Sequence, residues 1–108
     1  MYKHARRTLL LAAAISAVAV APASAATKSV SIDDFAFSPA SLSVSKGTKV
    51  VWNFEDSATH NVTVKSGPKK FHSKDKRSGS YSRKLKQAGT YRIHCSIHPD
   101  MRQTITVR

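Results

Sequence analysis

Short stretches of alternating apolar and polar residues constrain the fold of this chain more than any other feature. In "TKSVSID" (27–33) and "SLSVS" (41–45), Val, Ile and Leu alternate with polar residues, as in a strand with one buried face. No long segment after residue 26 has the apolar period of a helix. Gly, Pro, Ser or Asp separate the stretches, as turns require. The pattern predicts an all-β sandwich or barrel of antiparallel strands, with strands at 27–33, 41–45, 49–55, 60–64, 80–85, 90–95 and 104–107.

The N-terminus has the three parts of a secretory signal. Residues 1–7 are basic, residues 9–20 are almost entirely apolar, and Ala23-Ser24-Ala25 is a small-x-small cleavage site. The apolar run is too short to span a bilayer. We expect a signal peptide at 1–25 and one mature domain at 26–108, without a membrane span, in the periplasm or at the cell surface. Arg6-Arg7 is a weak sign of twin-arginine export, but the residues around it fit that signal poorly, so the sequence does not decide between this route and Sec export.

The mature chain is strongly basic and contains a single cysteine. Of the 18 Lys and Arg residues, three lie in the predicted signal, so 15 remain against 6 acidic residues, a balance of +9. A domain this small buries only about 60–65% of its unfolded surface, so a cross-link such as a disulfide or a bound metal would add to its stability. The single cysteine cannot form a disulfide within the chain. It must pair between chains, stay a free thiol or bind a metal.

The segment "HCSIHPDM" near the C-terminus gathers possible metal ligands. Cys95 continues the inward row of the 90–95 strand, whereas His94 points outward. Pro99 forces a turn after this strand, which places His98 and Met101 close to Cys95.

A soft metal ion suits these donors. Two histidines, one cysteine and a weak axial methionine form the ligand set of blue-copper sites. His60 can supply the second imidazole, because it opens the predicted strand 60–64 and a sandwich brings the ends of distant strands together. Zinc is the second choice, since it prefers four firm ligands.

Two motifs resemble those of the cupredoxins, a family of small blue-copper proteins. The first runs from F-x-P (37–39) through V-x-x-G-x-x-V-x-W (44–52) to H-N-V (60–62), and the second is G-T-Y-x-x-x-C-x-x-H-x-x-M (89–101). The second motif has the short ligand loop of the amicyanin type. The resemblance extends over about residues 30–107 and implies an antiparallel Greek-key β-sandwich that binds one copper ion.

The resemblance also implies a role for each site residue. The implied copper ligands are His60, Cys95, His98 and the axial Met101. Two residues would support them, Asn61 and Pro99; the Asn61 side chain would tie the ligand loops together, and its backbone N–H would touch the cysteine sulfur. Electrons would pass through the exposed ring edge of His98.

Three positions depart from the pattern of the family. Gln103 and Leu85 replace a glycine and an aromatic residue that are common there. Asp100 replaces an apolar residue of the ligand loop, and its carboxylate would favour Cu(II) over Cu(I) by Coulomb attraction. We therefore expect a reduction potential at the lower end for this class.

A basic run follows the first motif. Nine basic residues and one acid lie between Lys65 and Lys86, and an imbalance of this size produces a field that steers acidic partners. We expect an acidic redox protein, an electron donor or acceptor of the cell envelope, to dock on Lys65, Lys69, Lys70, Lys74, Lys76 and Arg77. Export argues against nucleic acid, an anionic envelope polymer would also fit, and a diffusing carrier is expected to be a monomer.

Three functions fit the residues, and a mobile one-electron carrier comes first. A protein that buffers or delivers copper to another exported protein is the alternative. A thiol enzyme built on Cys95 and a histidine is remote, because the chain has no Gly-rich element to stabilise an oxyanion and Met101 would have no purpose. We therefore expect no enzymatic activity.

Overall fold

The structure is a computed structural model that describes residues 26–108; the predicted signal peptide lies outside the described residues. Within them there are eight strands and no helix. The strands are β1 (Thr27–Asp33), β2 (Ala36–Ser38), β3 (Ser41–Val44), β4 (Thr48–Phe54), β5 (Thr63–Ser66), β6 (Ser80–Leu85), β7 (Gly89–His94) and β8 (Arg102–Val107).

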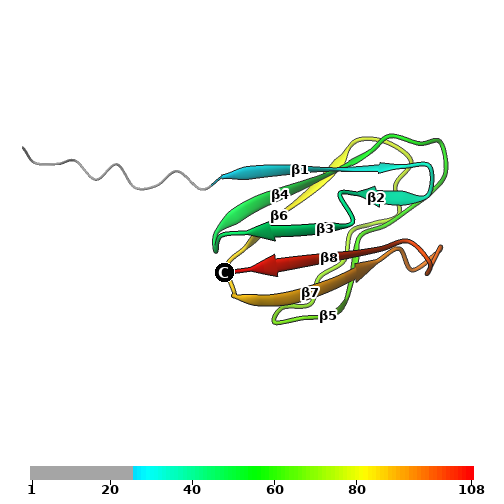
Figure 1. The fold of residues 1–108 in the computed structure, drawn as a ribbon. Coiled ribbons are helices and arrows are strands. Elements are labelled where there is room, and N and C mark those ends of the chain that lie inside the picture. The colour runs from blue at the N-terminus through cyan, green and yellow to red at the C-terminus, as the bar shows by residue number, and fades with distance from the viewer. Residues whose placement is uncertain (1–25) are drawn as a thin grey trace, which may run out of the picture.

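The strands form two four-stranded sheets packed face to face (Figure 1). Their orders are β2-β1-β4-β6 and β3-β8-β7-β5. The predicted all-β sandwich is confirmed. Pairing is mixed, however: β1 lies parallel to β4 and β3 parallel to β8, whereas the other four pairings are antiparallel. The parallel pairs arise because β3 belongs to the other sheet, so the chain returns to β4 from the end at which β1 began.

The inward rows of the two sheets make one hydrophobic core. Along β4 every second residue is buried, including Val50, Trp52 and Phe54, because successive strand residues point to opposite faces. A polar link crosses the core: the Trp52 indole N–H donates to Gln103 Oε1 at 2.8 Å, and Gln103 Nε2 donates to the Pro39 carbonyl at 2.8 Å. Gln103 stands where cupredoxins commonly have a glycine, and both its side-chain oxygen and its side-chain nitrogen are hydrogen-bonded.

Two strands differ from the sequence prediction. The strand expected at 60–64 begins only at Thr63, and His60 forms an isolated bridge with Lys76 instead. Residues 60–62 are extended, but they pair with the segment 73–76 rather than with a sheet. The short strand β2 was not predicted, because three residues are too few to show alternation. No helix in the described part of the chain is long and apolar enough to cross a membrane.

Candidate metal centre

The candidate ligands meet at one end of the sandwich. His60 lies in the segment between β4 and β5, and the other three lie in the loop between β7 and β8, residues 95–101. His60, Cys95 and Met101 are buried, with 1%, 0% and 3% of their surface exposed. His98 is half-buried. The topology thus joins two segments that lie more than thirty residues apart in the sequence.

The His60 ring points directly at the cysteine sulfur. Its Nδ1 atom lies 4.0 Å from Cys95 Sγ. Metal bonds of about 2.0 Å to nitrogen and about 2.3 Å to sulfur, set about 120° apart, would separate the two donor atoms by about 3.8 Å. The observed separation therefore matches two ligands of one ion. The Asn61 backbone N–H donates to the same sulfur at 3.4 Å.

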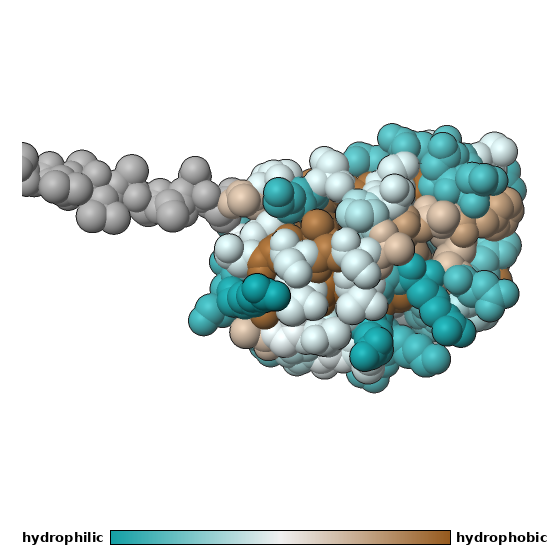
Figure 2. All heavy atoms as spheres, in the orientation of Figure 1, coloured by the Kyte–Doolittle hydropathy of each residue, from teal (hydrophilic) through white to brown (hydrophobic). Residues whose placement is uncertain are grey.

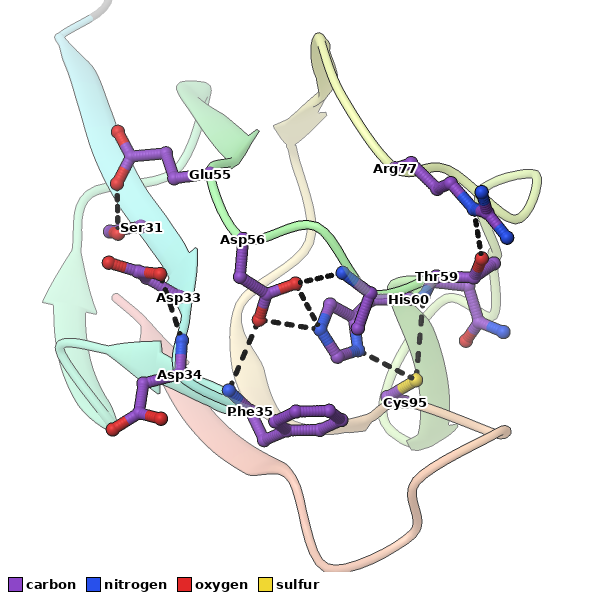
Figure 3. Close-up of polar contacts among 12 residues, drawn as sticks. Ser31, Asp33, Asp34, Phe35, Glu55, Asp56, Thr59, His60, Arg77 and Cys95 are labelled. Atoms are coloured by element: carbon purple, nitrogen blue, oxygen red, sulfur yellow. Dashed lines mark hydrogen bonds and ion pairs between the residues drawn. The ribbon is translucent and has the colours of Figure 1, made fainter.

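Asp56 fixes the orientation of the His60 ring. Its two carboxylate oxygens lie 2.8 and 2.7 Å from His60 Nε2 (Figure 3). Because a carboxylate only accepts, Nε2 carries the proton and the lone pair of Nδ1 faces Cys95. Burial opposes ionisation of Asp56, but hydrogen bonds from His60 and from the backbone N–H groups of Phe35 and Ala58 outweigh it and lower the pKa of the carboxyl group.

Sequence reasoning missed Asp56. It appeared as one of several scattered acids, and only the separation of four residues between Asp56 and His60 could have pointed to it. On a helix, a separation of four residues would place the two side chains next to each other, but residues 55–60 form a loop. The contact therefore depends on the tertiary path of residues 55–60.

Two backbone hydrogen bonds close the ligand loop. The Cys95 N–H donates to the Met101 carbonyl at 3.1 Å, and the Met101 N–H donates to the His98 carbonyl at 2.9 Å. Pro99 lies in the turn between His98 and Met101, and its carbonyl accepts from Arg102 Nε at 3.4 Å. These bonds keep the three candidate ligands of this loop close together.

The Asn61 side chain joins the two ligand segments. Its Nδ2 donates to Ser96 Oγ at 2.7 Å and to Asp75 Oδ1 at 2.9 Å. Its Oδ1 accepts from the Ser96 N–H at 2.9 Å and from Thr63 Oγ1 at 2.8 Å. Both hydrogen-bonding groups of a side chain that is 3% exposed are thus satisfied.

Phe35 covers the two histidines. Its ring lies edge-on to His60 and His98, with ring centroids 5.1 and 4.8 Å apart, and the two histidine centroids are 5.1 Å apart. Asp34 and Phe35 have φ angles of 51° and 56°, a left-handed conformation that costs about 1–2 kcal/mol per non-glycine residue. The turn between β1 and β2 places an exposed aromatic ring over the site in spite of this strain. Sequence analysis gave Phe35 no role.

The site fits a soft ion. Among residues 26–108, no three His, Cys, Asp or Glu side chains already form a closed metal-binding group. The fit rests on the His60–Cys95 pair, with a second imidazole, that of His98, next to His60, and with the Met101 thioether in the same closed loop as Cys95. One thiolate, two imidazoles and a thioether suit copper better than magnesium or calcium, which prefer oxygen ligands.

The predicted docking residues divide between the two ends of the sandwich. Lys76 pairs with His60 through its backbone, and Arg77 Nε donates to Thr59 Oγ1 at 3.0 Å, so the stretch 74–77 flanks the site. Lys65 lies within β5, and Lys69 and Lys70 lie in the turn at its far end. The structure therefore does not unite the six residues in one face around the site.

Comparisons with known sequences agree with this geometry. Residues 24–108 match the model of the family described as copper binding proteins, plastocyanin/azurin family. The chain is 34% identical over 102 residues to amicyanin-alpha of Methylorubrum extorquens (strain ATCC 14718 / DSM 1338 / JCM 2805 / NCIMB 9133 / AM1), and the match covers 91% of this chain and 84% of the relative.

Solved structures give the same fold. A methionine-to-alanine mutant of amicyanin in its Cu(I) form has a TM-score of 0.69 and 28% identity, with 76% of this chain and 82% of that chain covered. A Cu-containing nitrite reductase from Thermus scotoductus SA-01 also has a TM-score of 0.69, with 24% identity, 76% of this chain covered but only 22% of that chain. The second likeness concerns the fold alone.

Proposed function

The chain belongs to the plastocyanin/azurin family of copper-binding proteins, and we propose that it is an exported one-electron carrier whose copper ligands are His60, Cys95, His98 and Met101. A small copper electron carrier is the function that the family and the amicyanin relative support. The observation that carries the ligand assignment is the His60 Nδ1 atom 4.0 Å from the buried sulfur of Cys95, with the Asn61 N–H on that sulfur.

The protein residues prepare the site for electron transfer. One bound copper ion supplies the redox couple, Cu(I)/Cu(II). Asp56 holds the His60 ring in one orientation and tautomer, and Asn61 holds both ligand segments in register. Because these side chains are buried and hydrogen-bonded, the donors need little rearrangement when the charge of the site changes by one. Little rearrangement is the property that a fast carrier requires.

The electron is proposed to enter and leave through His98. Of the two candidate ligand histidines, His60 is buried and His98 is partly exposed. Next to His98, Ile97 is 42% exposed, and Phe35, whose ring lies against both histidines, is 50% exposed. The rim thus offers apolar surface around an imidazole edge. A redox partner would dock here with a local acidic patch against the flanking cations Lys74, Lys76 and Arg77.

Colour and electrochemistry test the proposal. Adding Cu(II) to the exported protein should give an intense blue thiolate-to-copper band, and Cys95→Ser should abolish it while leaving the sandwich folded by circular dichroism. Repeated reduction and reoxidation should return the full band. A colourless protein that binds Cu(II) at other residues would refute the ligand assignment.

A transfer assay separates carriage of electrons from delivery of copper. The copper-loaded protein is mixed with a colourless apo-protein acceptor, and the band is followed while the mixture is cycled with a mild reductant. A carrier keeps its copper through many cycles, whereas a delivery protein loses the band as the acceptor fills. Loss of the band with Cys95 intact would overturn electron carriage but not the ligand set.

A further inference from the structure

All the acidic side chains of residues 26–108 lie at one end of the sandwich, and the charged side chains of the other end are all basic. All six acids lie at the site end: one pair ends β1 and follows it, a second pair follows β4, one accepts a hydrogen bond from Asn61 and one lies in the ligand loop. In order these are Asp33, Asp34, Glu55, Asp56, Asp75 and Asp100. The four basic residues that share this end are Lys74, Lys76, Arg77 and Arg102.

Among residues 26–108, the other end carries no acid and eight exposed basic residues. These are Lys28, Lys46, Lys49, Lys69, Lys70, Lys84, Lys86 and Arg108. Lys28 lies near the start of β1, and the Lys46 N–H donates to the Arg108 carbonyl at 2.9 Å. Lys49 lies opposite Lys84 in the β4–β6 register.

Two turns complete this basic end. Lys86 follows β6 in the turn that leads to β7. Lys69 and Lys70 lie in the turn after β5, next to Pro68, whose ring lies so close to Gly89 that a Cβ added there would be 2.5 Å from it. Because Gly89 begins β7, this contact fixes the turn at the end opposite the metal site. In Figure 2, hydrophilic residues lie at this end, at the left of the view, and also cover the opposite end.

Repulsion among these cations works against the fold. Like charges that face each other across a strand pair, such as Lys49 and Lys84, are destabilising, and no acid in the described part of the chain lies at this end to offset them. A solubilising face needs no such concentration. An external anion would remove the repulsion.

A groove of about 390 Å³ opens on the side of this basic end. Its floor contains Phe71, Leu85 and Tyr91, which are buried members of the core, and its rim includes Lys84 and Lys86. The Arg83 guanidinium lies 4.8 Å from the centroid of the Phe71 ring, a cation–π contact that holds it over the apolar floor. The groove thus combines a cationic rim with an apolar floor, which suits an amphiphilic anion.

We propose that the basic end docks on an anionic phospholipid surface. Three of the eight cations lie on strands of the β2-β1-β4-β6 sheet, and the other five follow β3, β5, β6 and β8. They therefore cover an end face rather than follow a single line, which favours a plane over one extended chain. The phosphate groups of the lipids would lie among the lysines. The apolar floor of the groove would contact the apolar part of one phospholipid molecule. Since β7 leads from Gly89 at this end to Cys95 at the other, the metal site would face away from the membrane.

Vesicle binding tests the proposal without any use of the metal. The exported protein is sedimented with vesicles of phosphatidylglycerol and phosphatidylcholine, or of phosphatidylcholine alone, at low and high ionic strength. Binding is expected only with phosphatidylglycerol and should weaken with salt. The basic-end variant is Lys84→Gln with Lys86→Gln, and the matched control is Lys74→Gln with Lys76→Gln, which removes the same charge at the site end.

The two variants should separate clearly. Each basic residue near an anionic surface contributes about fivefold to the partition coefficient, so the basic-end variant should bind about tenfold or more weakly, and the control should change less than about threefold. Amine labelling should show vesicle protection of Lys46, Lys49 and Lys84 but not of Lys74. Thermal unfolding of each variant checks that it is folded.

Three results would overturn the proposal. Equal losses in both variants would mean that net charge alone attracts the protein. Absence of binding to phosphatidylglycerol vesicles at low ionic strength would exclude a membrane surface. Tight binding of soluble polyglutamate at the same lysines, without vesicle binding, would assign the basic end to an acidic protein instead.

Discussion

The two ends of the sandwich use the same strands but are held together by different interactions. At the site end, a partly buried network of polar side chains joins segments that the sheets do not pair: Asn61 binds Ser96 and Asp75, and Asp56 binds His60. At the basic end, glycine turns and close contacts do this work, as where Gly89 lies against Pro68, and the Tyr91 hydroxyl donates to the Gln87 carbonyl at 3.1 Å.

The difference shows that one fold can hold its two ends together by different means. Polar networks are directional, so they can fix the position of a donor atom, whereas turns and packing fix only the course of the backbone. The site end therefore fixes the positions of the candidate metal ligands, and the basic end presents a charged surface. Substitutions at the two ends should have separable effects.

Asn61→Ala should have the largest effect. It removes four hydrogen bonds of a buried side chain and separates the two ligand segments that these bonds join, so the free energy of unfolding should fall by about 2–4 kcal/mol and copper affinity by about 10–100-fold. Denaturant unfolding and competitive copper titration measure the two quantities. Asn53→Ala, on the outer face of β4, is the matched control and should change stability by less than about 0.5 kcal/mol. Equal effects of the two variants would contradict the role given to Asn61.

Gly89→Ala should destabilise the basic end without altering the site. Its φ is +141°, and the added Cβ would meet Pro68 Cγ at 2.5 Å, so a loss of about 1–3 kcal/mol is expected. Gly47→Ala is the control, because Gly47 also has a positive φ, +86°, but nothing lies within 4 Å of the added Cβ. Thermal unfolding should rank the two, and the blue band should stay in place in both. A shifted band in Gly89→Ala would show that the two ends are coupled.

Asp56→Asn and Asp100→Asn compare two carboxylates of the site end. Both variants remove a negative charge near the metal, so both should raise the reduction potential by favouring Cu(I). The rise should be larger for Asp56, which is mostly buried and 2.7 Å from His60 Nε2, than for the exposed Asp100, whose charge water screens. Voltammetry at fixed ionic strength measures both. An unchanged potential in Asp100→Asn would reject a role for Asp100 in setting a low potential.

Much of the architecture was predictable because period-two alternation is a local property. The strands β1, β3, β4, β6, β7 and β8 were placed to within a residue or two, since their buried rows are visible in the sequence. The strand expected at 60–64 began later, because residues 60–62 pair with a returning loop that no local pattern reveals. Parallel pairing was also missed, since it depends on which sheet the chain enters next.

The sequence by itself determined which donors are present and which of them share a loop: Cys95, His98 and Met101 follow one another at fixed spacing, and Pro99 turns the chain between them. Only the tertiary structure decided which distant groups join them. It brought Asp56 onto His60, placed Phe35 over both histidines and gathered every acid of residues 26–108 at the site end. The physical reason is range: spacing along a strand or turn fixes neighbours within a few residues, whereas contacts between loops depend on how the two sheets are stacked.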